Sequence, residues 1–477
     1  MKKVLKIKDL FCAAIVVFVI FGAASCKPKA DPLKIDGDCE YLAKILPEAS
    51  VDVSQTIDEG LNLDEVMADI KAEYAKNLKK YFWRLKLNES GIDENLFAYS
   101  IKEVFKNKLT RPNSHLSFST NSVSYSPYLC YLISFSDIYF EKSGSDYIVY
   151  DSDDKHVKAG MVYSGDESQL YKTIKDGKLL YRFGAEADQL IKKAEINVDG
   201  KKYTVPVNHP IHELDDKPNL TCEIDGKTMY VKFDSCSWHT EAEGNRLEEA
   251  AKQIGKTIKE QPLDYIIFDL RNNSGGLTSL PNEIIFSLIY GEENYENVDE
   301  FEWYNAYLED NELVINTLTT RNRTGMQGWG DTDRNRYLMT RADEKYVKIS
   351  GEEGEYAEDF IKEVSPIYNG KIIVIMNEFT ASATEHFIAY LKVVFKDRVI
   401  CVGQRTFGCY DYGNVYLYRL PDSKIAVLLS QSDYTQIPLL QNSGWQGDTV
   451  GFVPDYYFAF DDDFNIKNIT EQIELFF

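Results

Sequence analysis

Residues 371–395 read KIIVIMNEFTASATEHFIAYLKVVF, and this segment is the most informative part of the sequence for the fold. Lys371–Met376 is a continuous apolar run, which is typical of a strand buried on both faces of a sheet. The apolar spacing of Ala383–Phe395 predicts a helix. Ser382 would lie at the start of that helix, where free backbone N–H groups and the helix dipole can stabilise an oxyanion. Alternatively, Thr380 or Ser382 only caps the helix.

A second segment, residues 265–276, reads YIIFDLRNNSGG. Tyr265–Leu270 predicts another buried strand, which leads directly into a polar turn. Gly275 and Gly276 have no Cβ, so the backbone can turn its N–H groups toward a ligand. An ordinary strand-to-helix turn is the alternative interpretation.

Similar elements surround these two segments. Met229–Phe233 and Val399–Val402 are expected strands, and Asn245–Glu260 is an expected helix. The alternation of strands and helices predicts an α/β core over residues 226–477. Polar and aromatic residues at 291–365 are expected to form loops over the working edge of this core.

The preceding region has a different pattern. Apolar residues at helical spacing predict helices at 62–85 and 92–108, within a helical unit over residues 61–115. Short alternating runs separated by turns such as Asp199-Gly200 predict a β-rich region over residues 116–225.

The N-terminus predicts export. Residues 1–25 combine a lysine-rich start with a short apolar run, as a signal peptide does. Small residues just before Cys26 resemble the cleavage box of bacterial lipoproteins, so we expect a lipid on Cys26; an ordinary signal peptide with an incidental cysteine is the alternative. Residues 26–60 would form a tether and N-terminal segment. The protein would then be anchored in the bacterial cell envelope, outside the cytoplasm.

Composition narrows the partners further. The 477 residues carry a net charge of −23, which argues against nucleic acid as a partner. Six cysteines follow Cys26, and their pairing is left open because six thiols allow fifteen full pairings. The absence of a C-x-x-C motif argues against a zinc site, so no metal is expected.

Four motifs follow one another in the C-terminal half: DLRNNSGG at 269–276, TASATE at 380–385, VGQRTFG at 402–408 and GFVPD at 451–455. In this order the set resembles the tail-specific (C-terminal processing) serine peptidases and their tricorn-type relatives. The resemblance implies a crotonase/ClpP-like α/β spiral core and a peptide or unfolded protein as substrate, without a cofactor. It also implies that residues 116–225 are either a diverged PDZ domain or an unrelated β module.

The same resemblance assigns the site residues. Ser382 would be the nucleophile, and the oxyanion donors would be the N–H of Ala383 and one N–H of the Gly275-Gly276 turn. Tail-specific members place a lysine base at the position that Cys409 occupies here. A thiol is no substitute for a desolvated lysine, so a Ser/Lys dyad is not expected.

The tricorn-type branch instead takes its base from a Ser-His pair, which Ser114-His115 resembles. His115 would then be the general base, Ser114 a helper, and Asp448 the acid near the closing motif. An imidazole suits proton transfer at neutral pH because its ordinary pKa is near 6.5. His386 is a rival base, although a core position suits it better, and His115 could instead be a loop histidine bonded locally.

Two other functions fit parts of the sequence. A peptidase-fold lipoprotein could bind a peptide or an apolar ligand without turnover, and Cys409 favours this alternative. A surface lipoprotein for adhesion or nutrient capture would explain the export signal but not the motif series.

Overall fold

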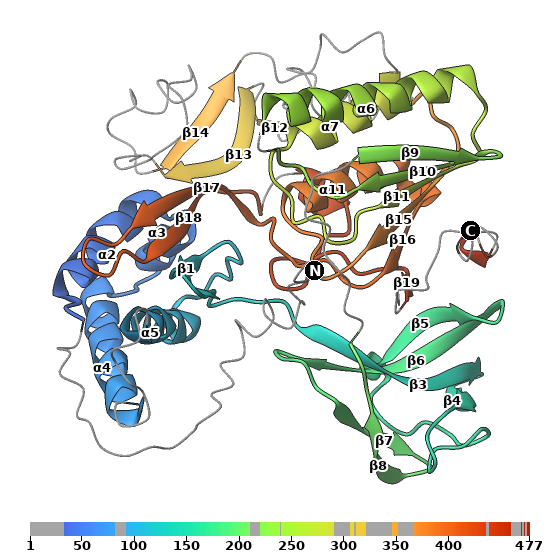
Figure 1. Cartoon of the computed structure of the whole chain (residues 1–477), viewed down its shortest axis with the longest axis horizontal. Helices are drawn as coiled ribbons and strands as arrows, with labels where there is room; N and C mark the ends of the chain where they lie inside the picture. The colour runs from blue at the N-terminus through green and yellow to red at the C-terminus, as the bar shows by residue number, and fades with distance from the viewer. Residues whose placement is uncertain are drawn as a thin grey trace, which may run out of the picture. The chain divides into compact units, whose positions relative to one another are not determined.

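The computed structural model describes most of the chain from residue 33 onward (Figure 1). The described residues are 33–81, 92–209, 220–238, 240–290, 306–309, 312–320, 346–351, 366–435, 438–458, 469, 472 and 475–477. The predicted signal peptide and Cys26 lie outside them.

The chain forms two compact units. Unit 1 contains Met1–Leu129, Asn305–Glu358 and Cys409–Leu440. Unit 2 contains Cys130–Tyr304, Asp359–Gly408 and Gln441–Phe477. These units cut across the boundaries expected from the sequence, because parts of the expected core at 226–477 pair with the N-terminal region.

Unit 1 begins with four helices: α2 (Asp36–Ala49), α3 (Val51–Asp58), α4 (Leu63–Tyr81) and α5 (Ile92–Lys108). The last two match the predicted helices. Asn62 caps α4, because its side-chain oxygen accepts hydrogen bonds from the N–H groups of Asp64 and Glu65. Helices α2 and α3 lie in the segment expected to be a tether, and their buried apolar residues belong to the unit's core.

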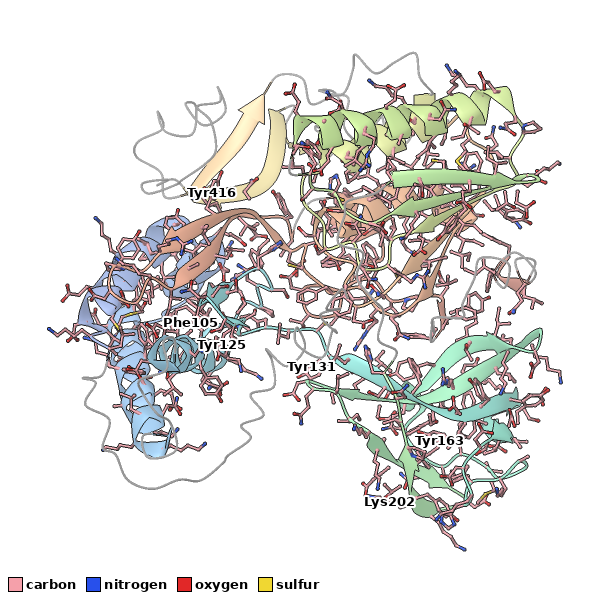
Figure 2. All side chains as sticks on the ribbon, in the orientation of Figure 1. Phe105, Tyr125, Tyr131, Tyr163, Lys202 and Tyr416 are labelled. Carbon is pink, nitrogen blue, oxygen red and sulfur yellow. The ribbon has the colours of Figure 1, made fainter. Side chains whose placement is uncertain are left out.

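A seven-stranded sheet completes unit 1. Its strands are β1 (Ser117–Ser119), β2 (Ser124–Tyr125), β12 (Ala306–Glu309), β13 (Glu312–Thr320), β14 (Tyr346–Gly351), β17 (Tyr412–Arg419) and β18 (Ala426–Asp433). β18 pairs antiparallel with β1, β13 and β17. Phe105 of α5, labelled in Figure 2, meets Phe118 of β1 edge-to-face at 5.4 Å. The region expected to form only loops at 291–365 therefore also supplies strands to this sheet.

Unit 2 contains the predicted α/β core. Its six-stranded sheet has the order β19 (Tyr456–Tyr457), β16 (Val399–Gly403), β15 (Lys371–Met376), β11 (Tyr265–Asp269), β10 (Thr228–Phe233) and β9 (Leu220–Asp225). All neighbours are parallel except β9, which is antiparallel to β10. The helices are α6 (Glu241–Glu260), α7 (Ser279–Tyr290), α11 (Ala383–Phe395) and the short α12 (Pro438–Asn442), which spans the unit boundary. Helices α6 and α7 lie side by side (Figure 1).

Local chemistry explains the element boundaries of the core. Helix α6 begins four residues before the predicted start because Thr240 and Glu243 form a reciprocal capping box. β15 and α11 have the predicted bounds, and residues 372–376 of β15 are all buried. Since β11, β15 and β16 are parallel neighbours, the loops after them emerge at one edge of the sheet.

The β-rich region of unit 2 precedes this core. A four-stranded sheet has the order β4 (Asp146–Ser152), β3 (Leu132–Ser143), β6 (Lys178–Ala187) and β5 (Leu170–Lys175). β7 (Lys193–Val198) and β8 (Lys201–Pro206) form a hairpin whose turn has positive φ at Asp199 and Gly200, as its Asp-Gly sequence predicts. Short 3₁₀ helices are η1 (Glu167–Gln169) and η4 (Lys396–Arg398). Within the described residues, no helix has the length and apolar character needed to cross a membrane.

Candidate active site

Hydrogen bonds join the loop after β15 to the loop after β11. The side-chain oxygen of Asn377 accepts from the N–H of Asn272 at 2.9 Å, and its amide group donates back to Asn272 Oδ1 at 2.8 Å. The Thr380 hydroxyl donates to the carbonyl of Leu270 at 2.8 Å. Thr380 therefore ties the two loops together and does not act merely as a helix cap.

Ser382 stands between this turn and helix α11 with a strained backbone. Its φ of 55° and ψ of −119° are rare for a residue with a side chain. Such a conformation costs on the order of 1–3 kcal/mol and is often found at functional sites. The surrounding hydrogen bonds hold the serine in this conformation at the positive end of α11.

Gly275 lies directly against Ser382. A Cβ on Gly275 would come within 2.6 Å of the Ala381 carbonyl oxygen and 2.8 Å of both the Ala383 nitrogen and the Ser382 Cβ. Its φ of 88° also favours glycine. The two segments singled out in the sequence therefore meet at the serine.

Two backbone N–H groups remain available beside the serine. The N–H of Gly275 donates to Asn273 Oδ1 at 3.0 Å, so it is already engaged. Within the described part of the chain, the N–H groups of Gly276 and Ala383 donate to no protein acceptor. Of the oxyanion donors expected from the sequence, Gly276 and Ala383 are therefore the two with unengaged N–H groups, and their role stays a prediction.

Glu385 links the serine to the third motif. One of its carboxylate oxygens accepts from the N–H of Ser382 and the other from the N–H of Gly408, both at 2.8 Å. The side chain is fully buried. In the sequence, only the place of Glu385 at the end of the TASATE motif singles it out.

Asp448 lies in the loop of the closing motif. The next residue, Thr449, donates its N–H to the carbonyl of Gly408 at 2.8 Å. Gly408 packs so closely on this loop that a Cβ would come within 2.8 Å of the Gly451 nitrogen. Asp448 is buried there. Within unit 2, Gly408 thus joins the Asp448 loop to Glu385, while the Gly275-Gly276 turn contacts the Ser382 loop directly.

Ser114 and His115 form a turn before β1 in unit 1. The N–H of His115 donates to Asn113 Oδ1 at 3.0 Å. Burial lowers the pKa of His115 to about 4. A backbone hydrogen bond at Tyr412 acts in the opposite direction but offsets only part of this effect. The imidazole is therefore neutral at pH 7, as a general base must be. Because His115 and Ser382 belong to different units, their pairing stays a prediction.

His386 packs in the core, as expected. Its Nε2 lies 3.0 Å from Asn282 Oδ1, and its ring meets Tyr390 edge-to-face at 4.6 Å. Burial lowers the pKa of His386 to about 3. These contacts give His386 a structural role in α11.

A buried pair that the sequence did not indicate joins His209 to Glu378. His209 Nε2 lies 2.6 Å from Glu378 Oε1, and His209 Nδ1 lies 2.9 Å from the carbonyl oxygen of Ile133. Both side chains are about 5% exposed. No local pattern in the sequence could indicate this pair, because the two positions lie 169 residues apart.

Among the described residues, no disulfide joins the cysteines, which are Cys39, Cys130, Cys222, Cys236, Cys401 and Cys409. Cys401 is a buried residue of β16, as expected, and Cys409 is also buried. Burial raises the pKa of Cys236 to about 12, so this thiol below the glycine turn is protonated. In the same described ranges, no group of three or more His, Cys, Asp or Glu side chains could hold a metal ion.

Known proteins resemble this chain in sequence and in structure. The model of peptidase family S41 matches residues 227–457. Among solved structures, the chain is similar to the photosystem II D1 C-terminal processing protease, with 13% identity, 92% of this chain and 97% of that chain covered, and a TM-score of 0.35. It is also similar to mature CPAF, with 13% identity, coverages of 92% and 95%, and a TM-score of 0.40. For a putative peptidase from Parabacteroides merdae the values are 14%, 95% and 97%, and 0.37.

The comparison with curated proteins returns no match. The family match, by contrast, spans all four motifs and therefore the loops that meet at Ser382. Residues 227–457 of this chain match the model of peptidase family S41.

Proposed function

We propose that this chain is a serine peptidase that cuts peptide bonds through an acyl-enzyme on Ser382. The match of residues 227–457 to peptidase family S41 supports a serine peptidase acting on peptides or proteins. The observation that carries the assignment of Ser382 is its strained position at the start of α11, against Gly275 and beside two unengaged N–H groups.

In the proposed reaction, His115 takes the proton of the Ser382 hydroxyl as its oxygen attacks the peptide carbonyl. The N–H groups of Ala383 and Gly276 stabilise the oxyanion, and one such donor is worth on the order of 10²–10³ in kcat. His115 then protonates the leaving amine, and water hydrolyses the acyl-enzyme. Ser114 would assist the base, and Asp448 would orient it.

The test is hydrolysis of a denatured protein or a peptide mixture by the wild type and by Ser382→Ala. We expect the substitution to remove the nucleophile and abolish cleavage. If neither protein cleaves, or if both cleave equally, the assignment is wrong.

We also propose that the enzyme is exported and anchored by a lipid on Cys26, so that its substrates are exported proteins or peptides at the cell envelope. The support is the N-terminal sequence alone. In a bacterial host fed a labelled fatty acid, the wild type should take up label and Cys26→Ala should not. Equal labelling of the two would contradict the anchor.

The second candidate is a binding lipoprotein with an inactive peptidase fold. Cys409 favours it, because a buried thiol stands where tail-specific relatives have their lysine base. A fluorophosphonate separates the two candidates, since it modifies an activated serine and leaves an unactivated one unlabelled. Labelling that disappears in Ser382→Ala would support the peptidase.

A further inference from the structure

We propose that the His209–Glu378 pair holds the Ser382 loop in its working position, which makes His209 a positioning residue for hydrolysis. The inference rests on the proposed function of Ser382. Both members lie in unit 2, and the pair connects the β-rich region to the turn that leads into the serine.

Glu378 is part of that turn. The N–H of Thr380 donates to the carbonyl of Asn377 at 2.9 Å across Glu378 and Phe379, and Ala381 then donates to the carbonyl of Asn273 at 3.0 Å. Displacing Glu378 would therefore shift both Ser382 and the glycine turn beside it. A shift of about 1 Å can lower a rate by about 100-fold.

His209 is fixed from the other side. Its Nδ1 faces the carbonyl of Ile133 in β3, and its neighbour Asn208 exchanges backbone hydrogen bonds with Phe135, each of 2.8 Å. The pair thus connects the serine loop to a strand of the β-rich sheet.

The same strand end holds a second motif loop. Ile133 pairs with Glu186 of β6, and Glu186 forms an ion pair with Arg405 at 3.3 Å. Arg405 also donates to the carbonyl of Tyr131, which precedes β3, at 3.2 Å (Tyr131 is labelled in Figure 2). Two motif-bearing loops are therefore bonded to one end of the β-rich sheet.

The chemistry of the pair requires one shared proton. A carbonyl oxygen only accepts, so Nδ1 of His209 must carry hydrogen toward Ile133. The 2.6 Å bond from Nε2 to Glu378 then needs a second proton, held either by the imidazolium or by the carboxylic acid. Loss of that proton would set a nitrogen lone pair against a carboxylate oxygen and break the bond.

Because both side chains are buried, loss of this hydrogen bond would be costly. The second carboxylate oxygen of Glu378 is buried and has no hydrogen-bond partner among the described residues. Without His209, the carboxylate would be buried and unpaired, which is costly. Burial alone lowers the pKa of His209, but the hydrogen bond and charge of Glu378 and the Ile133 carbonyl outweigh it and raise the pKa above its usual value.

Other ionisable groups lie near the His209–Glu378 pair, but they do not account for the expected pH dependence. Cys130 lies near Glu378, but burial raises the pKa of its thiol to about 12. Arg405 forms an ion pair with Glu186. Glu385 accepts two backbone hydrogen bonds, from Ser382 and Gly408.

The experiment measures kcat/KM from pH 6 to pH 10 for the wild type, His209→Ala and Glu378→Gln. The wild type should lose activity as pH rises through the raised pKa of His209. In Glu378→Gln the alkaline loss should disappear, because a glutamine amide can donate to a neutral Nε2 without the extra proton. His209→Ala should lose activity on the order of 10–100-fold at every pH.

His156→Ala is the matched control, since His156 is an exposed histidine of the same β-rich region and should give the wild-type profile. If His209→Ala and Glu378→Gln also give the wild-type profile, the proposal is overturned. Melting temperatures identify a variant that fails to fold.

Hydrogen exchange of residues 377–385 tests the pair without relying on turnover. After correction for intrinsic rates, exchange should accelerate in His209→Ala and in the wild type at alkaline pH. Equal protection in both proteins across the pH range would overturn the proposal. A wild type that neither cleaves nor labels defeats the proposed function instead, and exchange still decides whether the pair orders the loop.

Discussion

The close approach of Gly275 to Ser382 is the strictest requirement that the site places on a single residue, because no Cβ fits there. The sequence predicted a glycine turn and a serine at a helix start, because both signals are local. It did not show that the N–H of Gly275 is engaged by Asn273, which leaves the N–H of Gly276 as the proposed oxyanion donor of that turn. Such an assignment depends on how one side chain folds back onto its own loop.

Gly275→Ala should reduce kcat by at least about 100-fold, because the added methyl group would overlap the Ala381 carbonyl and displace the serine. Peptide hydrolysis measures the effect. Gly200→Ala is the control, since Gly200 also has a positive φ but has open space around its Cα. Equal losses in the two variants would mean that backbone strain, and not the contact with Ser382, is responsible.

The lowered pKa of His115 predicts the acid limit of activity. A base works when deprotonated, so kcat/KM should stay level down to about pH 5 and fall near pH 4, instead of falling near the ordinary value of 6.5. A pH profile of peptide hydrolysis checks this limit. His115→Ala should be inactive throughout, and an acid limit that survives in this variant would exclude His115 as the base.

At the scale of elements, β15 and α11 could be predicted with their bounds because each is a continuous local pattern. The start of α6 was missed because its capping box lies before the apolar run. The pairing of β18 with β1, which sets Leu428 opposite Ser117, could not be predicted. No periodicity in a single sequence links segments so far apart.

Glu385→Gln should weaken the junction between α11 and the Gly408 loop. A glutamine has one acceptor oxygen, so it cannot serve the N–H groups of both Ser382 and Gly408. We expect a loss of about 1–3 kcal/mol in the free energy of unfolding and a lower kcat. Urea denaturation and peptide hydrolysis measure the two effects. Glu249→Gln, an exposed change on α6, should alter neither.

For the molecule as a whole, the buried histidines make the free energy of unfolding depend on pH. The pKa values of His386 and His115 are lowered to about 3 and about 4, so the unfolded chain binds more protons than the folded one below pH 6.5. Stability should therefore fall as pH drops from 6.5 toward 4. The raised pKa of His209 acts in the opposite window, because its contribution is present below pH 6.5 and is lost as pH rises through the raised value.

His386→Gln tests this dependence. Each buried histidine contributes a slope of up to about 1.4 kcal/mol per pH unit, so the variant should show a shallower acid slope whatever its stability at pH 7. Chemical denaturation at pH 7, 6 and 5 gives the slope. A slope identical to that of the wild type would contradict the assignment, and His156→Gln, an exposed change, should leave it unaltered.

Unit 1 is built from three segments that lie far apart in the chain, and this affects how the protein is made. Phe105 and Phe118 share their apolar core with Val427 and Leu429 of β18, which the ribosome makes some 300 residues later. At roughly 5–20 residues per second, the early helices wait on the order of tens of seconds for that strand. A chain that ends before β18 would present an uncovered apolar face, so unit 1 completes its core only after most of the chain has been made.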